Sequence, residues 1–333
     1  MAEVNKANEL LREKISCDSG EADVIQFIKF GLQLCYVLPF GLLYISFMMT
    51  ILRKRKSREL FEDSFFTLYL VDGIVTIVFL ILDFSFFRTT SYIRPVCEFF
   101  IPIFATPAYY LTPYYTIYMY TQFAKMLSTL TMSINRYTSI NCPVLHKTFW
   151  VAHCSKAIAA ILLIPLLFVW PVAIARTNFA PFNGQGVIGY EHIFLWARTT
   201  YGRILVGGTT LVFTVFASVV TTAKLSKLGN HMRKVEYSMN IATIFVSAGF
   251  VLQLMLQISY LTFDANTLVE SPWVVMMILA LAQLVNDFYM LSGPVVLLIL
   301  DKRIRASVFC CCRRRFNNKQ TTEVSVRPVT STM

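Results

Sequence analysis

The chain has 333 residues, of which 56% are hydrophobic and only 15% are charged, and its formal net charge is +11. A soluble domain rarely combines so much apolar sequence with so little charge, so the composition indicates a membrane protein. The sequence holds no Walker loop, no Cys-x-x-Cys pair and no His-Glu-x-x-His pattern, and its 4 His residues are scattered. We therefore expect no metal site, no cofactor and no enzymatic activity.

Seven apolar segments follow one another along the chain. Reading for about 20 consecutive apolar residues, we expect helices near 26–52, 64–87, 108–137, 155–176, 201–223, 237–262 and 273–300. The polar first 24 residues do not resemble a signal peptide, so the first span is expected to direct insertion. The predicted fold is all-α: a seven-transmembrane helix bundle (25–309), an N-terminal segment (1–24) and a cytoplasmic tail (310–333).

Basic residues are divided unequally between the two ends of this bundle. The segments after the first, third and fifth spans and the tail hold 5, 3, 4 and 8 Lys or Arg residues, whereas the opposite side holds 9. The positive-inside rule places the heavier side in the cytoplasm and the N-terminus outside. An inner basic surface faces anionic membrane lipid, so the net charge requires no nucleic-acid partner. The inverted topology, with the basic segments outside, is the alternative.

The third span ends in Asn135-Arg136-Tyr137, with Ile140 and Pro143 beyond it. A positive-inside anchor would explain an arginine there, but not the full spacing Arg-Tyr-x-x-Ile-x-x-Pro. The pattern resembles the inner end of the third helix in rhodopsin-like receptors, where the arginine is held inside at rest and meets the G protein when the helices part. Asn135 stands where an acidic residue is common, and its amide can hydrogen-bond a guanidinium but supplies no charge.

The seventh span carries a second resemblance to these receptors. Gly293-Pro294-Val295-Val296-Leu297 is similar to their Asn-Pro-x-x-Tyr segment, with Gly293 in place of Asn and Leu297 in place of Tyr. The basic stretch 301–305 is similar to the short helix that follows, and we expect an amphipathic helix on the inner leaflet. The sixth span lacks the Trp and Pro of the usual switch, so the resemblance is to a divergent branch.

Three further segments narrow the branch: Leu70-Val71-Asp72-Gly73, Ala124-Lys125, and Phe149-Trp150 after Pro143. They resemble nematode serpentine chemoreceptors, with class gamma (Srg) as the nearest match. The resemblance runs from about Phe30 to Arg305.

Such a resemblance implies a chemosensory G-protein-coupled receptor that binds a small external cue, an odorant or a pheromone. It implies a heterotrimeric G protein as partner and a multi-pass location in the plasma membrane, in the cilia of sensory neurons. A second copy of the receptor is a further partner that the sequence neither requires nor excludes. A ligand-gated cation channel, or an orphan seven-helix protein without G-protein coupling, is the alternative. A light sensor would need a Lys between Trp273 and Leu300, where there is none.

Ionisable side chains at mid-bilayer cost about 2.5–3.5 kcal/mol and usually face the bundle interior. A helix rises by about 1.5 Å per residue. Counted from the ends of their spans, three ionisable side chains are therefore expected at nearly the same depth in the bilayer: Asp72, Lys125 and Asp287. We expect Lys125 to pair with Asp72, with Asp287 as a second partner. In rhodopsin-like receptors the corresponding aspartate helps to hold sodium, so the Lys125 ammonium would act as a tethered cation and activity should not depend on sodium. A pair that only holds helices together is the alternative.

Polar and aromatic side chains gather in the outer halves of three spans. The candidate ligand pocket consists of Tyr114, Tyr118, Gln122, Gln253, Gln257, Tyr260, Gln283 and Asp287. Polar side chains spaced along one face of a helix form a stripe. Such stripes suit a cavity that hydrogen-bonds a small ligand, and they also suit hydrogen bonds between packed helices in the interior of the bundle. Asp83 would add a negative charge at the mouth and Arg203 would meet an acidic group, so the sequence does not decide the charge of the ligand.

Two groups stand out among the 8 cysteines of the chain. Cys17 and Cys97 are the only two in the expected external segments, and we expect them to form a disulfide, with two free thiols as the alternative. At the other end, Cys310, Cys311 and Cys312 precede three arginines, a pattern typical of palmitoylation beside a polybasic flank. Three reduced cytosolic thiols are the alternative. The tail beyond them is polar and expected to be disordered.

Overall fold

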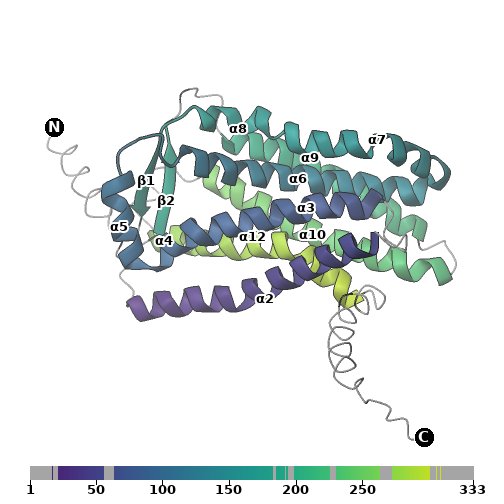
Figure 1. The fold of residues 1–333 in the computed structure, drawn as a ribbon, viewed down its shortest axis with the longest axis horizontal. Coiled ribbons are helices and arrows are strands. Elements are labelled where there is room, and N and C mark those ends of the chain that lie inside the picture. Colours follow the sequence, from purple (N-terminus) through teal and green to yellow (C-terminus); the bar gives the residue numbers. More distant parts are fainter. Residues whose placement is uncertain are drawn as a thin grey trace, which may run out of the picture.

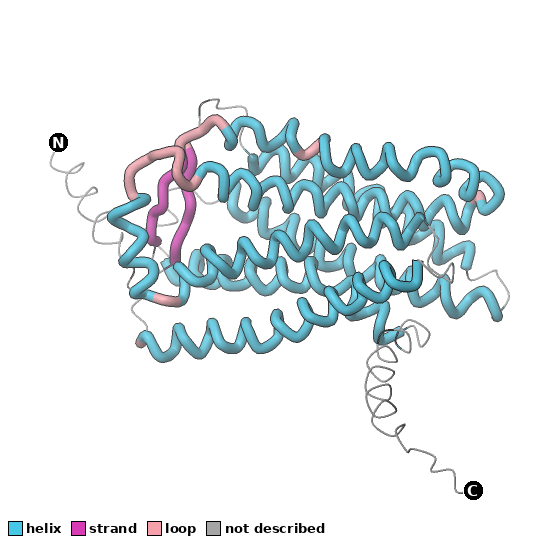
Figure 2. The backbone as a smooth tube through the Cα atoms, in the orientation of Figure 1, coloured by secondary structure: helices cyan, strands magenta, loops and turns pink. Residues whose placement is uncertain are grey.

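The computed structural model describes residues 17, 22–55, 64–182, 185–191, 193, 199–225, 230–262, 272–300, 305 and 308. Long helices lie side by side in one bundle (Figure 1), and nearly all of the described chain is helical (Figure 2). The bundle consists of α2 (Asp23–Arg55), α3 (Ser64–Leu82), α6 (Thr112–Asn141), α7 (Pro143–Leu163), α8 (Leu166–Ala173), α9 (Thr199–Leu225), α10 (Asn230–Thr262) and α12 (Pro272–Leu300).

Several of these helices meet the requirements of membrane spans. Five described segments are long and apolar enough to cross a membrane by length and composition: Asp23–Arg53, Ser64–Tyr92, Pro143–Ala173, Thr199–Lys224 and Met277–Leu300. Helix α6 is not among them, because its many Tyr, Thr and Ser residues make it less apolar, and α10 contributes a shorter apolar stretch, Ile244–Ser259. The expected all-α membrane bundle is confirmed, whereas the count of seven spans stays a prediction.

The core is aromatic and lies where α3, α6, α10 and α12 face one another. Phe79, Phe123 and Phe250 are almost fully buried, as is Leu297, the residue in the place of the receptor tyrosine. Many large apolar side chains on α2, α7 and α9 are exposed instead. Outward apolar surface is what a helix bundle in lipid requires.

The second span continues beyond its expected end at residue 87. Helix α3 runs directly into a π-helix, η1 (Asp83–Arg88), and then into α4 (Thr89–Tyr92). Extended backbone at Ile93 ends the helix. An unexpected helix, α5 (Arg94–Phe104), follows, with Pro95 in its first turn, where a proline removes no hydrogen bond.

The connection between the third and fourth spans is helical rather than a loop. Helix α6 ends at Asn141 and α7 begins at Pro143, so the fourth span starts well before the expected residue 155. Two side chains of α7 fix this corner: Trp150 Nε1 donates to Thr138 Oγ1 at 2.9 Å, and His146 Nδ1 lies 3.0 Å from the same oxygen.

A two-stranded hairpin, which the sequence did not predict, covers one end of the bundle. Strands β1 (Thr177–Phe182) and β2 (Gln185–Tyr190) pair antiparallel, with Thr177 opposite Tyr190. Residues 184–189 spell Gly-x-Gly-x-x-Gly. This motif binds dinucleotides only at a turn from a strand into a helix, and here residues 185–189 lie along strand β2 of a hairpin. We call this end of the bundle, with β1, β2 and α5, the hairpin end, and the opposite one the Arg136 end (Figure 1).

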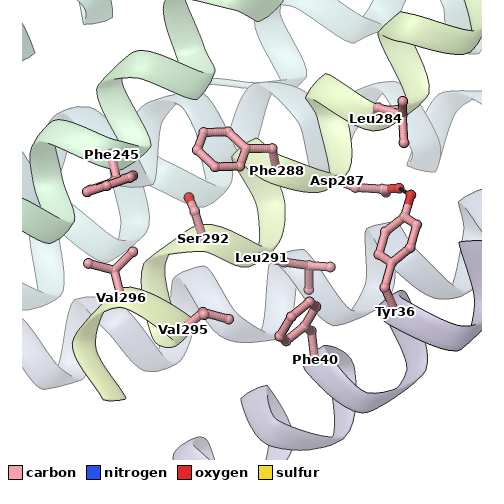
Figure 3. A pocket seen from close by; sticks show the side chains of 10 residues that line it. All are labelled: Tyr36, Phe40, Phe245, Leu284, Asp287, Phe288, Leu291, Ser292, Val295 and Val296. Carbon is pink, nitrogen blue, oxygen red and sulfur yellow. Dashed lines mark hydrogen bonds between the residues drawn. The ribbon is translucent and has the colours of Figure 1, made fainter. Parts of the chain in front are cut away.

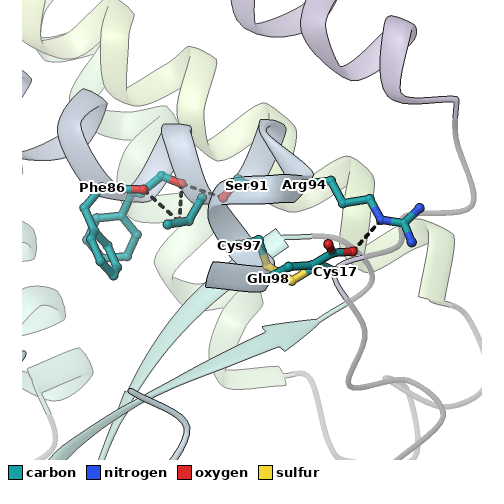
Figure 4. Close-up of a disulfide and its surroundings, with 8 residues drawn as sticks. Cys17, Phe86, Ser91, Arg94, Cys97 and Glu98 are labelled. Carbon is teal, nitrogen blue, oxygen red and sulfur yellow. Dashed lines mark hydrogen bonds and ion pairs between the residues drawn. A yellow bond between two sulfur atoms is a disulfide. The ribbon is translucent and has the colours of Figure 1, made fainter. Parts of the chain in front are cut away.

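A disulfide joins Cys17 to Cys97 at the hairpin end, across 80 residues of sequence (Figure 4). This is the pairing that we expected from the sequence, and both cysteines are buried. Next to it, Arg94 and Glu98 form an exposed ion pair at 2.8 Å along one face of α5. The bond ties the segment before α2 to α5.

A Cys97→Ser variant is expected to lose about 2–4 kcal/mol of stability, because the crosslink restricts the unfolded chain. Thermal unfolding of the purified protein in detergent would show this as a lower midpoint. The matched control is Cys35→Ser, which changes an exposed free cysteine on α2 and should leave the midpoint unchanged. Equal midpoints for the two variants would contradict the expectation.

Candidate functional site

A buried arginine organises the interior near the hairpin end. Arg88 is fully buried, and its Nε donates to Asp83 Oδ2 at 2.5 Å. Its Nη1 donates to Asp287 Oδ2 at 2.9 Å, and its Nη2 donates to Asp287 Oδ1. Nη1 also lies 3.0 Å from Gln33 Oε1, and the guanidinium carbon lies 4.3 Å from the centre of the Phe84 ring. We call Asp83, Arg88 and Asp287 the Arg88 cluster; its formal charge is −1, since two carboxylates meet one guanidinium.

The π-helix is what makes the first of these ion pairs possible. Residues five apart in an α-helix point about 140° away from each other, given 3.6 residues per turn. The i→i+5 winding of η1 instead brings Asp83 and Arg88 to the same side of the helix. Arg88 is not among the residues predicted for the site, because a second span that ends at residue 87 leaves it among the surface cations.

Amide and hydroxyl groups from three helices extend the Arg88 cluster. Tyr36 donates its hydroxyl proton to Asp287 Oδ2 at 2.5 Å. Gln33 Nε2 donates to Tyr92 Oη at 2.8 Å, and Tyr92 donates in turn to Gln283 Oε1 at 2.6 Å. Two residues predicted for the pocket, Gln283 and Asp287, therefore belong to one network with α2 and α4.

The predicted pocket residues of α6 border the same cluster. Tyr118 donates to Asp83 Oδ1 at 3.3 Å, and its ring stacks on Phe79 with centroids 5.1 Å apart. Tyr114 donates to the Leu82 carbonyl at 2.5 Å, the last residue before the π-helix. Gln122 is buried one turn further along α6. Asp83 therefore lies inside the bundle as an ion-paired group, rather than as a free charge at its mouth.

A second buried ion pair lies deeper in the bundle. Lys125 Nζ donates to Asp72 Oδ2 at 2.7 Å and to Thr76 Oγ1 at 3.0 Å. The Asp72 carboxylate also accepts hydrogen bonds from Tyr44 at 2.9 Å and from Ser128 at 2.5 Å. The pairing of Lys125 with Asp72 agrees with the sequence-based expectation.

The expectation that Asp287 would be a second partner of Lys125 is wrong. Its carboxylate is held by Arg88 and Tyr36. The Thr76 hydroxyl takes the second place beside the ammonium. Counting residues along the helices placed Asp72, Lys125 and Asp287 at a common depth. It could not reveal that the Arg88 guanidinium would bind the Asp287 carboxylate instead of Lys125.

The glutamine stripe of α10 lies apart from the Arg88 cluster. Gln257 Oε1 accepts from Arg203 Nη1 at 3.3 Å, and Arg203 Nη2 contacts the sulfur of Met119. Within the described ranges, Arg203 has no carboxylate at ion-pair distance, and Gln253 Oε1 has no hydrogen-bond partner. The side chain of Tyr260 lies outside the described residues.

The predicted pocket residues thus fall into two groups. In the part of the chain that the structure describes, no hydrogen bond joins Gln253 or Gln257 to Gln283 or Asp287. One group contacts a cluster with excess negative charge, and in the other Gln257 binds the cation Arg203.

At the Arg136 end, Arg136 is buried, with its guanidinium carbon 3.9 Å from the centre of the Phe65 ring. The neighbouring Asn135 is also buried, and its Nδ2 donates to Ser64 Oγ at 2.7 Å. Its amide therefore binds the start of α3. Tyr137 packs against two phenylalanine rings of α9.

The remaining expectations concern the predicted palmitoylation site and metal binding. Cys310, Cys311 and Cys312, the predicted palmitoylation site, lie outside the described residues. Among those described, no group of three or more His, Cys, Asp or Glu side chains could hold a metal ion.

An all-α bundle with long apolar helices, outward apolar surface and paired interior charges is a multi-pass membrane protein. Comparison of sequences identifies its kind: the model of the Srg family of chemoreceptors matches residues 30–308, and the chain belongs to this family. This is a family of receptors rather than of enzymes.

The chain is similar to several proteins of Caenorhabditis elegans. It is 27% identical to serpentine receptor class gamma-4, over 93% of this chain and 99% of that protein. It is also 27% identical to serpentine receptor class gamma-14, over 89% of this chain and 88% of that protein. With serpentine receptor class gamma-2 the identity is 22%, over 93% of each chain. The similarity therefore extends over almost the whole chain.

Proposed function

We propose that this protein is a chemosensory G-protein-coupled receptor of the plasma membrane. It binds a small external molecule near the hairpin end and signals to a heterotrimeric G protein at the Arg136 end. The observation that carries the proposal is the Arg88 cluster, a buried ion network that joins α2, the π-helix and α12. Charged groups within membrane spans are costly and are typically functional. A ligand that binds one arrangement of such a network better than another shifts the balance between receptor states.

The proposed ligand site includes both groups of predicted residues. Those on α6 and α12 (Tyr114, Tyr118, Gln122, Gln283 and Asp287) would sense the ligand through the Arg88 cluster. Those on α10 (Gln253, Gln257 and Tyr260) would do so beside Arg203. Gln253 supports this role: its buried carbonyl oxygen has no hydrogen-bond partner among the residues that the structure describes, and such an oxygen is unfavourable until a donor reaches it.

Two features support an external hairpin end. A disulfide persists in an oxidising compartment, and Cys17–Cys97 lies at this end. The segments rich in Lys and Arg follow α2, α6 and α9 at the opposite end, where the positive-inside rule requires them. The N-terminus is then outside, and seven spans complete the bundle.

Signalling is proposed to pass through Asn135, Arg136 and Tyr137. Arg136 is buried against Phe65, so a G protein could contact its guanidinium only after α3 and α6 rearrange. We further propose a location in sensory cilia, palmitoylation of Cys310–Cys312 beside an anionic lipid surface, and receptor dimers as a state to be tested.

An Arg136→Ala variant is expected to lose at least tenfold of its ligand response while it still reaches the cell surface. The measurement is second messenger in cells with promiscuous G proteins, exposed to a panel of small nematode-secreted metabolites. Lys147→Ala changes an exposed cation at the same end of the bundle and should leave the response intact.

Other outcomes of the same assay separate the rival functions. An ionic current that persists in the Arg136→Ala variant would indicate a ligand-gated channel. A second-messenger response unchanged by that substitution would contradict coupling through Arg136. No response to any metabolite, with the protein shown at the surface, would favour an orphan membrane protein without G-protein coupling.

A further inference from the structure

A cavity of about 300 Å³ lies between α2, α10 and α12 (Figure 3). Its walls are mostly apolar, with rings from all three helices: Phe40, Phe245 and Phe288. The volume is about ten times the roughly 30 Å³ that one water occupies in the liquid. It therefore has room for about ten heavy atoms of an apolar molecule, and so much apolar surface does not favour water.

The cavity opens toward the surroundings of the bundle rather than toward its axis. Phe245, Phe288 and Leu284 line it and are also 45%, 41% and 49% exposed. These helices pass through a membrane, so their exposed apolar side chains face lipid. A molecule dissolved in the bilayer can thus reach the cavity from the side, without crossing the hairpin end.

The polar groups of the cavity indicate what kind of molecule fits. At one end, the Asp287 carboxylate already accepts hydrogen bonds from Tyr36 and from two nitrogens of Arg88. It therefore does not require a cationic ligand. Further along, Ser292 is buried and its hydroxyl has no hydrogen-bond partner in the described part of the chain. Figure 3 shows this hydroxyl among the rings of Phe245 and Phe288.

We propose that this cavity binds a neutral, membrane-dissolved molecule with an apolar chain and one hydroxyl group, of the fatty-alcohol kind. The chain lies among the phenylalanine rings, and the ligand hydroxyl exchanges a hydrogen bond with Ser292. A hydroxyl suits this position because serine can donate to it and accept from it. The site shares Asp287 with the external ligand site proposed above, but it is reached from the bilayer and does not depend on G-protein coupling.

The occupant would also contact the Arg88 cluster. Asp287 and Tyr36 form one wall of the cavity, and the same carboxylate binds Arg88. Occupancy from the membrane would therefore stabilise the present position of Asp287. Binding at this site and the state of the ion network are coupled through one residue.

The test is photolabelling of the full-length protein in lipid nanodiscs by a fatty alcohol of about ten carbons that carries a diazirine and an alkyne. We expect label on α12 near Ser292, which excess unlabelled alcohol displaces. Val296→Trp fills the cavity and should reduce this label at least fivefold. The matched control, Val212→Trp, adds the same ring at an exposed position of α9 and should reduce nothing.

A second pair of variants tests the hydroxyl contact. Ser292→Ala should weaken displacement by the unlabelled alcohol roughly three- to tenfold, the usual worth of one hydrogen bond. Ser218→Ala removes another buried hydroxyl that has no partner in the described ranges, on α9 and away from the cavity, and should change nothing. The alkane of the same length, which lacks the hydroxyl, should displace the photolabel equally well from the wild-type protein and from Ser292→Ala.

Two results would overturn the proposal. One is that the label is spread over the exposed helices and that its amount is the same in Val296→Trp as in the wild-type protein. The other is an unchanged displacement constant in Ser292→Ala. If Val296→Trp fails to fold, the Ser292→Ala and Ser218→Ala comparison decides alone, because it adds no volume.

Discussion

An Arg88→Met variant is expected to reach the cell surface at less than a tenth of the wild-type level. The substitution removes the cation from between Asp83 and Asp287 and leaves two buried carboxylates without it. Removal of one partner from a buried ion pair costs about 3–5 kcal/mol, which is a large part of the total stability of a protein. The measurement is antibody binding to an N-terminal epitope on intact cells, relative to total protein.

The control for this variant is Arg94→Met, six residues further on. Arg94 also forms an ion pair, but its side chain is 43% exposed and that of Glu98 is 55% exposed, so the loss should be small. A triple variant, Asp83→Asn, Arg88→Met and Asp287→Asn, should recover part of the surface level, because no uncompensated charge remains. A surface level for Arg88→Met equal to that of Arg94→Met would show that the cluster is not needed for folding.

The second large effect is expected from Asp72→Asn. This change keeps the shape of the side chain but leaves the buried Lys125 ammonium without a negative charge beside it, so that neutral oxygens such as that of Thr76 are its acceptors. By the same reasoning we expect a loss of about 3–5 kcal/mol and a several-fold drop in surface level. Normal trafficking and signalling by Asp72→Asn would refute this.

A double-mutant cycle separates the pair from its two residues. Lys125→Met alone should cost less than Asp72→Asn, since Tyr44 and Ser128 still donate to the Asp72 carboxylate. The double variant should be more stable than Asp72→Asn, because the unpaired ammonium is gone. Strictly additive losses would mean that the two side chains do not interact.

Much of the bundle could be predicted because membrane spans obey a simple length rule. Apolar stretches of the required length gave most of the helices, and the depth of Lys125 and Asp72 along their helices was enough to pair them. The Cys17–Cys97 disulfide was also accessible, since no other cysteine lies in the expected external segments.

The Arg88 cluster could not be predicted in the same way. Hydropathy ends the second span at residue 87, and helical periodicity assumes 3.6 residues per turn, so Asp83 and Arg88 point apart in any such reading. Only the π-helix brings them together. The error for Asp287 followed directly, because its real partner was counted among the surface cations.

The hairpin and α5 escaped prediction for another reason. Segments between spans carry no periodic apolar signal. The hairpin did leave one signal in the sequence, since Asn183-Gly184, a dipeptide typical of two-residue hairpin turns, separates Phe182 from Gln185, but a reading for apolar spans passes over it. Its strands are held by tertiary contacts, including the bridge between Ala108 and Thr177.

The winding of η1 makes the second span adjustable in its rotation. Its i→i+5 turn brings Asp83 and Arg88 together, so a molecule that separated the two side chains would remove one interaction that stabilises this turn and would favour the ordinary α-helical pitch. The chain beyond would then turn about the helix axis, and it leads without a flexible linker through α4 to α5. Because Cys97 on α5 is bonded to Cys17, that rotation would pull on the segment before α2. A local loss of one ion pair would become a mechanical displacement shared by the first two spans.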